Sequence, residues 1–216
     1  MKKTAFFAMI VLLAGTVQAQ QDAKAKAVLD KLSQTTKSYK SVQIDFSFTL
    51  ENKAANVKET NDGSVAMKGK SYFLHMPALG TDIFCDGTTV WSYLSDANEV
   101  NISTNEPGDE GSLNPANIFT IYEKGFNFTY AGEETVAGKA TQVIDLFPTD
   151  KSKEFNKVRL YVDKIKSQIV SAKTFNKDGN VYTLVMKNMK TDQLLGDDYF
   201  KFNKAKYPGV EVNDMR

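Results

Sequence analysis

The stretch Thr81–Glu99 reads TDIFCDGTTVWSYLSDANE, in which two apolar and aromatic runs, 83–85 and 90–93, flank Asp86-Gly87. An Asp-Gly pair between β-prone runs is the strongest short-range hairpin signal, because the tight turn requires positive φ angles. We therefore predict a central β-hairpin here. The segments around it repeat the pattern of an aromatic strand closed by an Asn, Asp or Gly turn, which predicts one large curved sheet built hairpin by hairpin.

Period-two alternation predicts a half-buried strand near residue 46. Ile44, Phe46, Phe48 and Leu50 fall on one face of this strand, and polar residues alternate with them on the other face. Asn61-Asp62-Gly63 predicts the next turn. Counted along the chain, such segments predict about ten or eleven antiparallel strands.

Helical spacing of apolar residues predicts two amphipathic helices. The first covers Ala23–Tyr39, and the second, shorter helix covers Pro115–Phe126 with Asn114 as its N-cap. The stretch Asn105–Asn114 has no period and is rich in Gly, Pro and acidic residues, which predicts a loop.

Residues 1–19 are expected to form a signal peptide. Two lysines precede an apolar run at Ala5–Gly15, and Val17-Gln18-Ala19 supplies the small residues that signal peptidase requires. The mature chain is then a single domain over 20–216. Thr16 stands where a bacterial lipoprotein would carry its acylated Cys, so we expect no lipid anchor.

The composition indicates an exported soluble protein of the periplasm. The 216 residues are 42% hydrophobic and 25% charged, and removal of residues 1–19 leaves 25 Lys and Arg against 26 Asp and Glu. This balance suggests neither nucleic acid nor an anionic membrane as a bulk electrostatic partner. The single Cys excludes an internal disulfide.

The sequence offers little from which to build an active site. His75 and Cys85 are the only residues of their types and could meet across adjacent strands as base and nucleophile. The favoured interpretation is a small buried Cys and a hydrogen-bonded His. Glu106, Asp109 and Glu110 lack the spacing of a calcium loop and fit a solvated loop better. We therefore expect no enzymatic activity, no metal and no cofactor.

Large apolar residues on the predicted strands are the most informative feature. If the sheet curls into a barrel or half-barrel, its concave side would be lined by Phe46, Phe48, Leu50, Met67, Leu74, Trp91, Tyr93, Leu184 and Met186. From periodicity alone, the alternative of a filled core in a structural β domain is the stronger interpretation.

The hairpin also carries a family resemblance. Phe84–Tyr93, FCDGTTVWSY, resembles the DGxxxWxY hairpin of the LolA family of periplasmic carriers of outer-membrane lipoproteins. The likeness continues in order through Asn114-Pro115, Val143–Pro148, Leu160–Asp163 and the closing stretch Pro208–Asp214.

The resemblance implies a mainly β fold with two or three helices, in which an unclosed antiparallel β-barrel of about eleven strands is covered by amphipathic lid helices. The two predicted helices would be the lids, and their cavity-facing residues would be Val28, Leu29, Leu32, Ile118, Phe119 and Tyr122. The implied function is that of a monomeric carrier. It would receive acylated lipoproteins from an inner-membrane release complex and deliver them to an outer-membrane acceptor.

Two points stay open within the resemblance. The cargo could instead be another amphiphile, such as a glycolipid, which the protein would carry or sense.

In members that resemble the enterobacterial carrier, an Arg hydrogen-bonds the lid backbone and keeps the empty cavity shut. The matching stretch here, Met67–Lys70, has no Arg, so Lys68 or Lys70 is the expected substitute, without the planar fork of a guanidinium.

Overall fold

The computed structural model describes residues 22–105, 122 and 125–216. In this part of the chain there are one α-helix and twelve strands, and all twelve strands belong to one sheet. The elements are α1 (Ala23–Ser38), β1 (Val42–Asn52), β2 (Val57–Lys68), β3 (Ser71–Met76), β4 (Thr81–Cys85), β5 (Thr89–Leu94), β6 (Glu99–Thr104), β7 (Phe126–Val136), β8 (Lys139–Pro148), β9 (Phe155–Asp163), β10 (Ile169–Asn176), β11 (Val181–Thr191) and β12 (Glu211–Asp214), with 3-10 turns at Pro77–Leu79, Asp197–Phe200 and Lys204–Lys206.

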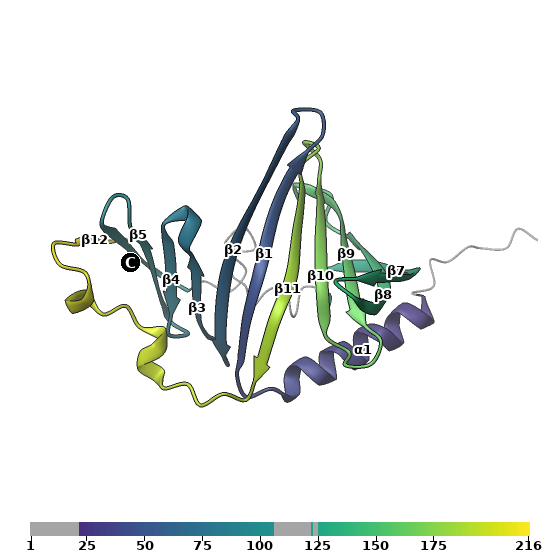
Figure 1. Cartoon of the computed structure of the whole chain (residues 1–216), viewed down its shortest axis with the longest axis horizontal. Coiled ribbons are helices and arrows are strands. Elements are labelled where there is room, and N and C mark those ends of the chain that lie inside the picture. The colour runs from purple at the N-terminus through teal and green to yellow at the C-terminus, as the bar shows by residue number, and fades with distance from the viewer. Residues whose placement is uncertain (1–21, 106–121, 123–124) are drawn as a thin grey trace, which may run out of the picture.

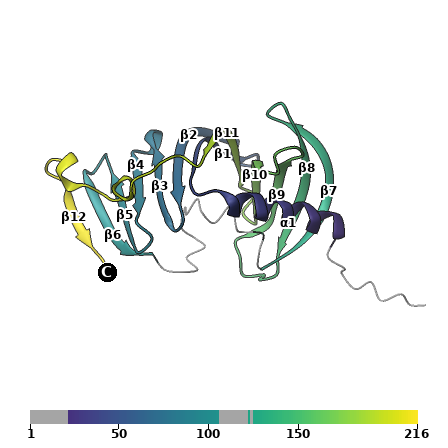
Figure 2. The ribbon, with the colours of Figure 1, turned by 90° about the horizontal axis from the view of Figure 1, so that it is seen from below.

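The sheet is open, with β12 and β7 at its two edges. The order is β12-β6-β5-β4-β3-β2-β1-β11-β10-β9-β8-β7, and Figures 1 and 2 show that it bends along its length. The prediction of a mainly β, unclosed sheet is confirmed. Its purely antiparallel character is wrong in one place, because β12 pairs in parallel with β6. The chain reaches that position only through the long segment after β11 (Figure 1).

Helix α1 forms where its apolar spacing predicted it. Asp22 is the N-cap, and its Oδ1 accepts hydrogen bonds from the amides of Lys24 and Ala25 at 2.9 and 3.2 Å. Ala25, Val28, Leu29 and Leu32 are buried and recur at helical spacing. The helix therefore has one apolar face, which it turns toward the sheet.

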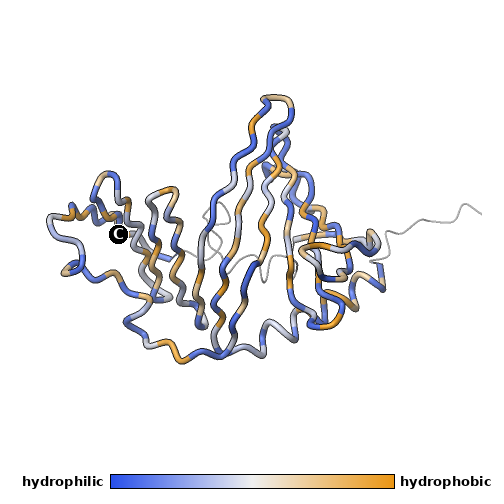
Figure 3. The backbone as a smooth tube through the Cα atoms, in the orientation of Figure 1, coloured by the Kyte–Doolittle hydropathy of each residue, from blue (hydrophilic) through white to orange (hydrophobic). Residues whose placement is uncertain are grey.

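Each strand presents alternate residues to two faces of the sheet. We call the face that bears Ile44, Leu74 and Leu160 the inner face, because these residues share one apolar cluster with α1. The outer face bears the residues between them, such as Asp45 and Phe73. Figure 3 shows the alternation as hydrophobic and hydrophilic positions along the strands.

The hairpin at Asp86-Gly87 is confirmed, but it is not central. Gly87 has φ 99°, and the Asp86 carboxylate accepts hydrogen bonds from the amides of Thr88 and Thr89 at 3.0 and 2.9 Å. The strands that it joins, β4 and β5, lie toward the β12 edge, whereas β2, β1 and β11 occupy the middle of the sheet. The longest strands, rather than the most aromatic hairpin, form the centre.

The turn predicted at Asn61-Asp62-Gly63 is wrong. These residues lie inside β2 and pair with Phe48, Ser47 and Phe46, and the turn falls instead at 53–56, where Asn56 has φ 54°. Gly63 serves packing: a Cβ there would lie 2.7 Å from Cζ of Phe46 and 2.6 Å from Sδ of Met76. The glycine makes room for two inner-face side chains. In the sequence, this glycine after Asn61-Asp62 cannot be distinguished from one that a turn requires.

Several expectations fall outside the described residues. These are the signal peptide at 1–19, the acidic loop with Glu106, Asp109 and Glu110, and most of the second helix at Pro115–Phe126. Of that helix, Tyr122 is described and buried, and Phe126 begins β7. A search of the described residues for a helix long and apolar enough to cross a membrane found none.

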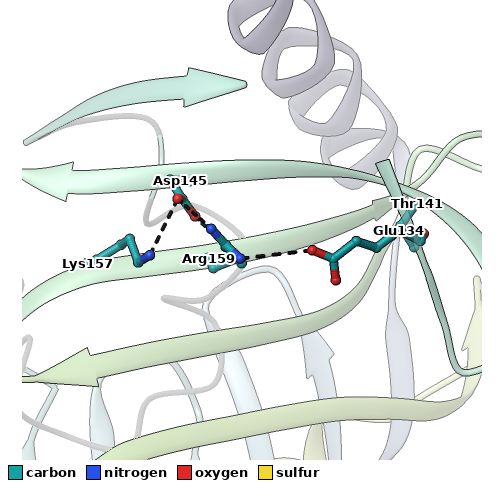
Figure 4. Close-up of polar contacts among 5 residues, drawn as sticks. All are labelled: Glu134, Thr141, Asp145, Lys157 and Arg159. Atoms are coloured by element: carbon teal, nitrogen blue, oxygen red, sulfur yellow. Dashed lines mark hydrogen bonds and ion pairs between the residues drawn. The ribbon is translucent and has the colours of Figure 1, made fainter. Parts of the chain in front are cut away.

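An ion-pair cluster joins β7, β8 and β9 on the outer face (Figure 4). Arg159 binds both carboxylate oxygens of the nearly buried Asp145 at 2.6 and 2.8 Å, and Lys157 Nζ lies 3.5 Å from Oδ2. Glu134 Oε1 lies 3.9 Å from Arg159, and Thr141 donates to the Glu134 carbonyl at 2.7 Å. Burial raises the pKa of Asp145, but the hydrogen bonds and charge of Arg159 outweigh it and hold that pKa below its usual value.

We expect Arg159→Met to lower the free energy of unfolding by about 2–3 kcal/mol. This cost is at the low end of what removal of one partner of a buried ion pair costs, because the guanidinium is partly exposed. Urea denaturation at neutral pH measures this, with the exposed Lys164→Met as a control that changes little. The effect should shrink as the pH falls through the depressed pKa of Asp145, because the protonated carboxyl no longer gains from Arg159. An effect no larger than the control's would contradict this account.

Candidate functional site

The inner face is a continuous apolar surface across both halves of the sheet. Ile44 lies opposite Val65, and Val65 lies opposite Leu74 on the β12 side. Toward β7, Ile144 lies opposite Leu160. All five side chains are buried and belong to the cluster that also contains the apolar face of α1. This surface is the candidate functional site.

Helix α1 covers only part of this surface. Figure 2 shows it along the β7–β11 half, on the inner side of the bend. The predicted lid residues Val28, Leu29 and Leu32 are all buried in the cluster, as is Tyr122 from the second predicted lid. The other two predicted lid residues, Ile118 and Phe119, lie outside the described residues.

A second part of the inner face is only partly buried. Phe48 stacks on Tyr182 with ring centroids 5.7 Å apart, and Leu184 lies directly opposite Phe48. The partly buried apolar residues that pack against the cluster are Tyr39, Phe48, Ile83, Val90, Phe126, Phe128, Tyr130, Phe155, Leu184 and Met189. An apolar ligand that packed against these side chains would remove their remaining exposed surface from water.

The structure places seven of the nine predicted cavity residues on the inner face. Phe46, Met67, Leu74 and Met186 are buried there, whereas Phe48, Leu50 and Leu184 are half-buried. The prediction is wrong for Trp91 and Tyr93, which lie on the outer face. Trp91 pairs with Phe84, which pairs with the outer-face residue Phe73. Because the runs 83–85 and 90–93 are apolar at successive positions, alternation could not assign their faces.

Sequence reasoning also missed inner-face residues on the β7 side. Phe126, Phe128 and Tyr130 pack against the cluster from β7, and Phe155 stacks on Phe126 at 6.1 Å. The signal was present, because FNFTY places aromatic residues at every second position.

The outer face has an aromatic cluster of its own. Phe73 stacks on Phe84 at 4.5 Å, and the segment after β11 covers them with Tyr199, Phe202 and Tyr207. A groove of about 640 Å³ lies between this segment and the strands. Trp91 and Tyr93 belong to this side of the sheet, and Tyr93 contacts the Tyr207 ring with centroids 4.4 Å apart.

The possible Cys85 and His75 pair does not form. Cys85 is fully buried on the inner face, and burial raises the pKa of its thiol. His75 is exposed on the outer face, where its Nδ1 lies 2.5 Å from the Asp82 carboxylate. Over residues 22–105, 122 and 125–216, no group of three or more His, Cys, Asp or Glu side chains could hold a metal ion.

Hydrogen bonds attach α1 at both of its ends. The Asp22 carboxylate caps the helix through Oδ1, and its Oδ2 accepts a hydrogen bond from the Tyr130 amide of β7 at 2.8 Å. The hydrogen bonds from Tyr130 and the helix amides lower the pKa of Asp22. At the other end, Gln168 donates to the Tyr39 hydroxyl at 2.8 Å. The N-terminal link uses an edge-strand amide that faces away from β8.

Lys68 does not contact α1. Its ammonium group donates to the Leu195 carbonyl and pairs with Asp197, both at 2.9 Å. It therefore ties the end of β2 to the segment after β11, on the outer face. The expectation that Lys68 replaces a lid-binding Arg finds no support in these contacts, and Lys70 is exposed at the adjacent turn.

Comparison with known proteins gives one family and several similar folds. A family profile described as "Outer membrane lipoprotein carrier protein LolA" matches residues 17–203. A conserved uncharacterized protein from Thermus thermophilus has a similar structure (TM-score 0.58, 14% identity, 88% of this chain and 99% of that chain covered). So does the lipoprotein LppX from Mycobacterium tuberculosis (TM-score 0.50, 14% identity, 82% and 100% covered). A search of curated protein sequences found no match.

We expect Asp22→Ala to loosen α1 without unfolding the sheet, because it removes the cap and the link to β7 together. Hydrogen exchange at neutral pH should then become faster in the first turns of α1 and at the Tyr130 amide. The control is Asp30→Ala, which removes only the exposed ion pair with Lys26 on the same helix. Equal exchange in both variants would contradict the role of Asp22.

Proposed function

This chain belongs to the LolA family, described as outer membrane lipoprotein carrier proteins, and we propose that it is a non-enzymatic carrier that binds lipoprotein acyl chains on its inner face. It takes the lipoprotein from the inner membrane and delivers it to the outer membrane. One observation carries this proposal: the apolar inner face continues beyond α1 and includes partly exposed residues such as Phe48 and Leu184.

The physical demand on such a carrier is to shield acyl chains from water. Each methylene that leaves water contributes about 0.8 kcal/mol, so an acylated protein does not cross an aqueous compartment unaided. None of the side chains that point to the inner face from Val42–Phe48 of β1, Gly63–Met67 of β2 and Tyr72–Met76 of β3 is charged. Met67, Met76 and Phe46 are among these inner-face residues. Met and aromatic side chains adapt to a pliable chain without fixing one geometry.

Release requires that the cover be reversible. The attachment of α1 at its two ends depends on a few hydrogen bonds, Asp22 to the Tyr130 amide and Gln168 to the Tyr39 hydroxyl. Opening one end would expose the inner face without breaking any strand pairing. The proposal therefore assigns α1 the role of a lid.

The proposed setting follows from the family. The protein acts as a monomer in the periplasm, receives cargo from an inner-membrane lipoprotein-release complex and passes it to an outer-membrane acceptor. The family match and the predicted signal peptide at 1–19 support this setting.

Native mass spectrometry of the protein purified without detergent from its own periplasm tests the proposal. We expect part of the population to carry the mass of an acylated lipoprotein, which lipid extraction would remove. Free lipid or glycolipid would indicate a carrier or sensor of another amphiphile. A clean unbound mass that also refuses added triacylated lipopeptide would refute acyl-chain binding.

Phe48→Glu tests the surface itself. A charge on the inner face opposes apolar ligands unless water reaches it, so we expect at least about tenfold weaker lipopeptide binding with an unchanged far-UV spectrum. Thr49→Glu is the matched control, because it places the same charge on the next residue of β1, which faces the outer side. Wholesale unfolding of Phe48→Glu would instead show that Phe48 belongs to a filled core.

A further inference from the structure

The outer face carries a groove that the proposed carrier function does not use. The groove has a volume of about 640 Å³ and lies between β3 and β4 and the segment after β11, which Figure 2 shows running across these strands. This volume falls within the roughly 300–1,000 Å³ that is typical of small-molecule sites. The apolar cluster with α1 lies on the opposite face of the sheet, so a ligand in the groove would not compete with one on the inner face.

The apolar lining of this groove consists of aromatic rings. Among the described residues, no Leu, Ile, Val or Met lines the groove, and the rings, which we call the aromatic wall, are Phe73, Phe84, Tyr199, Phe202 and Tyr207. Ring contacts join them in a chain, with centroids 5.7 Å apart for Tyr199 and Phe73 and 4.5 Å apart for Phe73 and Phe84. Phe202 continues the chain from Phe84 at 5.8 Å to Tyr207 at 4.6 Å. All of these rings except Phe84 keep part of their surface exposed.

The segment that forms one side of the groove is fixed at both of its ends. Lys68 donates to the Leu195 carbonyl at 2.9 Å, and the side-chain amide of Asn98 donates to the Pro208 carbonyl at 3.2 Å. Between these points the side chain of Phe200 is buried, so the segment does not lie loosely on the surface. The groove is therefore formed before any ligand arrives, and a ligand pays little to order it.

Three lysines give this groove a positive charge. Lys201, Lys204 and Lys206 line it, and among the described residues no hydrogen bond or ion pair engages their ammonium groups. Asp198 is the one acidic residue among the described residues that line the groove. The lining thus has two positive charges in excess, all on the segment after β11.

Two further carboxylates lie near the groove, but each already has a partner. Asp197 pairs with Lys68 at 2.9 Å, and Asp82 lies 2.5 Å from Nδ1 of His75. Burial raises the pKa of the Tyr207 hydroxyl, and the negative charge of Asp82 adds to this shift, which places Asp82 close to one end of the aromatic wall. Neither carboxylate forms an ion pair with the lysines of the groove, so their ammonium groups are left for a ligand.

From this combination we propose that the groove is a second binding site, which takes a small organic anion with a ring body. The ring body lies against the aromatic wall, and the acidic group of the ligand accepts charge-assisted hydrogen bonds from the lysine ammonium groups. This site is independent of the proposed carrier function, because it lies on the other face of the sheet.

The difference between the two faces favours a ring over an acyl chain in the groove. The inner face includes Met67, Met76 and several aliphatic side chains, which adapt to a flexible ligand. The aromatic wall is made only of rings that contact one another, and such rings pack best against other rings. A rigid ring body also loses less conformational freedom on binding than a chain with many rotatable bonds.

A nuclear magnetic resonance titration of the exported, processed protein with 2-naphthoate tests the site. We expect saturable shifts of the backbone amides of residues 198–207, Phe73 and Phe84, and binding that weakens with added salt. Two other probes separate the two parts of the ligand. The neutral 2-naphthamide keeps the ring without the charge, and octanoate keeps the charge without the ring, so each should bind at least about tenfold more weakly.

Lys204→Gln combined with Lys206→Gln should weaken 2-naphthoate binding at least about tenfold, because it removes two of the three ammonium groups. The matched control is Lys53→Gln combined with Lys58→Gln, which removes the same charge at the far end of the β1–β2 hairpin. All four lysines are exposed, so the far-UV spectrum should stay unchanged in both variants.

The inference is overturned if 2-naphthoate does not bind saturably, if octanoate binds as tightly, or if the control variant loses as much affinity. Shifts confined to inner-face residues such as Phe48 and Leu184 would also overturn it. Saturation with soluble triacylated lipopeptide separates the two proposals. Displacement of 2-naphthoate by lipopeptide would refute a separate site in the groove, whereas a protein that binds 2-naphthoate in the groove but refuses lipopeptide would refute only the carrier function.

Discussion

The structure depends on one constraint, the need to keep an unusually long apolar face out of water. Twelve strands form an open sheet, and in its middle the inner-face positions of β1, β2 and β3 are predominantly apolar. Apolar surface left in water costs about 25 cal/mol per Å², so bending the sheet and covering it are both favoured. Within the described residues, α1 covers only the β7–β11 half. The remaining partly buried surface is where a ligand gains most from contact.

The same alternation creates a second demand on the opposite side. Phe73 and Phe84 project from the outer face of β3 and β4, and the segment after β11 covers them with Phe202 and Tyr207. Lys68 fastens the start of that segment through Asp197 and the Leu195 carbonyl. This course carries the chain to β6, where β12 adds the parallel edge strand. The outer cover is thus a packing requirement of the sheet, separate from the candidate site.

The features that depend only on residues close together in the sequence were predicted correctly. The first helix, the alternation through Phe46 and Phe48 and the turn at Asp86-Gly87 follow from spacing and turn chemistry alone. Long-range contacts determined the rest. Gly63 sits within a strand because Phe46 and Met76 need its space, and Trp91 faces outward because of its register with Phe84. Neither contact can be predicted from the residues next to it in the sequence. The same holds for Asp22, which caps α1 and also accepts a hydrogen bond from the Tyr130 amide.

Under the proposed function, α1 must leave part of the inner face when a ligand binds there. Its apolar residues, such as Leu29 and Leu32, gain free energy only while something apolar lies against them, and its ends are held by directional hydrogen bonds. Opening the helix would expose apolar surface on both partners, which makes the open state rare without a ligand. Under the proposed function, an acyl chain that covers both surfaces would remove that cost and shift the population toward an open, loaded state. In the proposed carrier, the hydrophobicity of the acyl chain itself would provide the differential affinity for the open state.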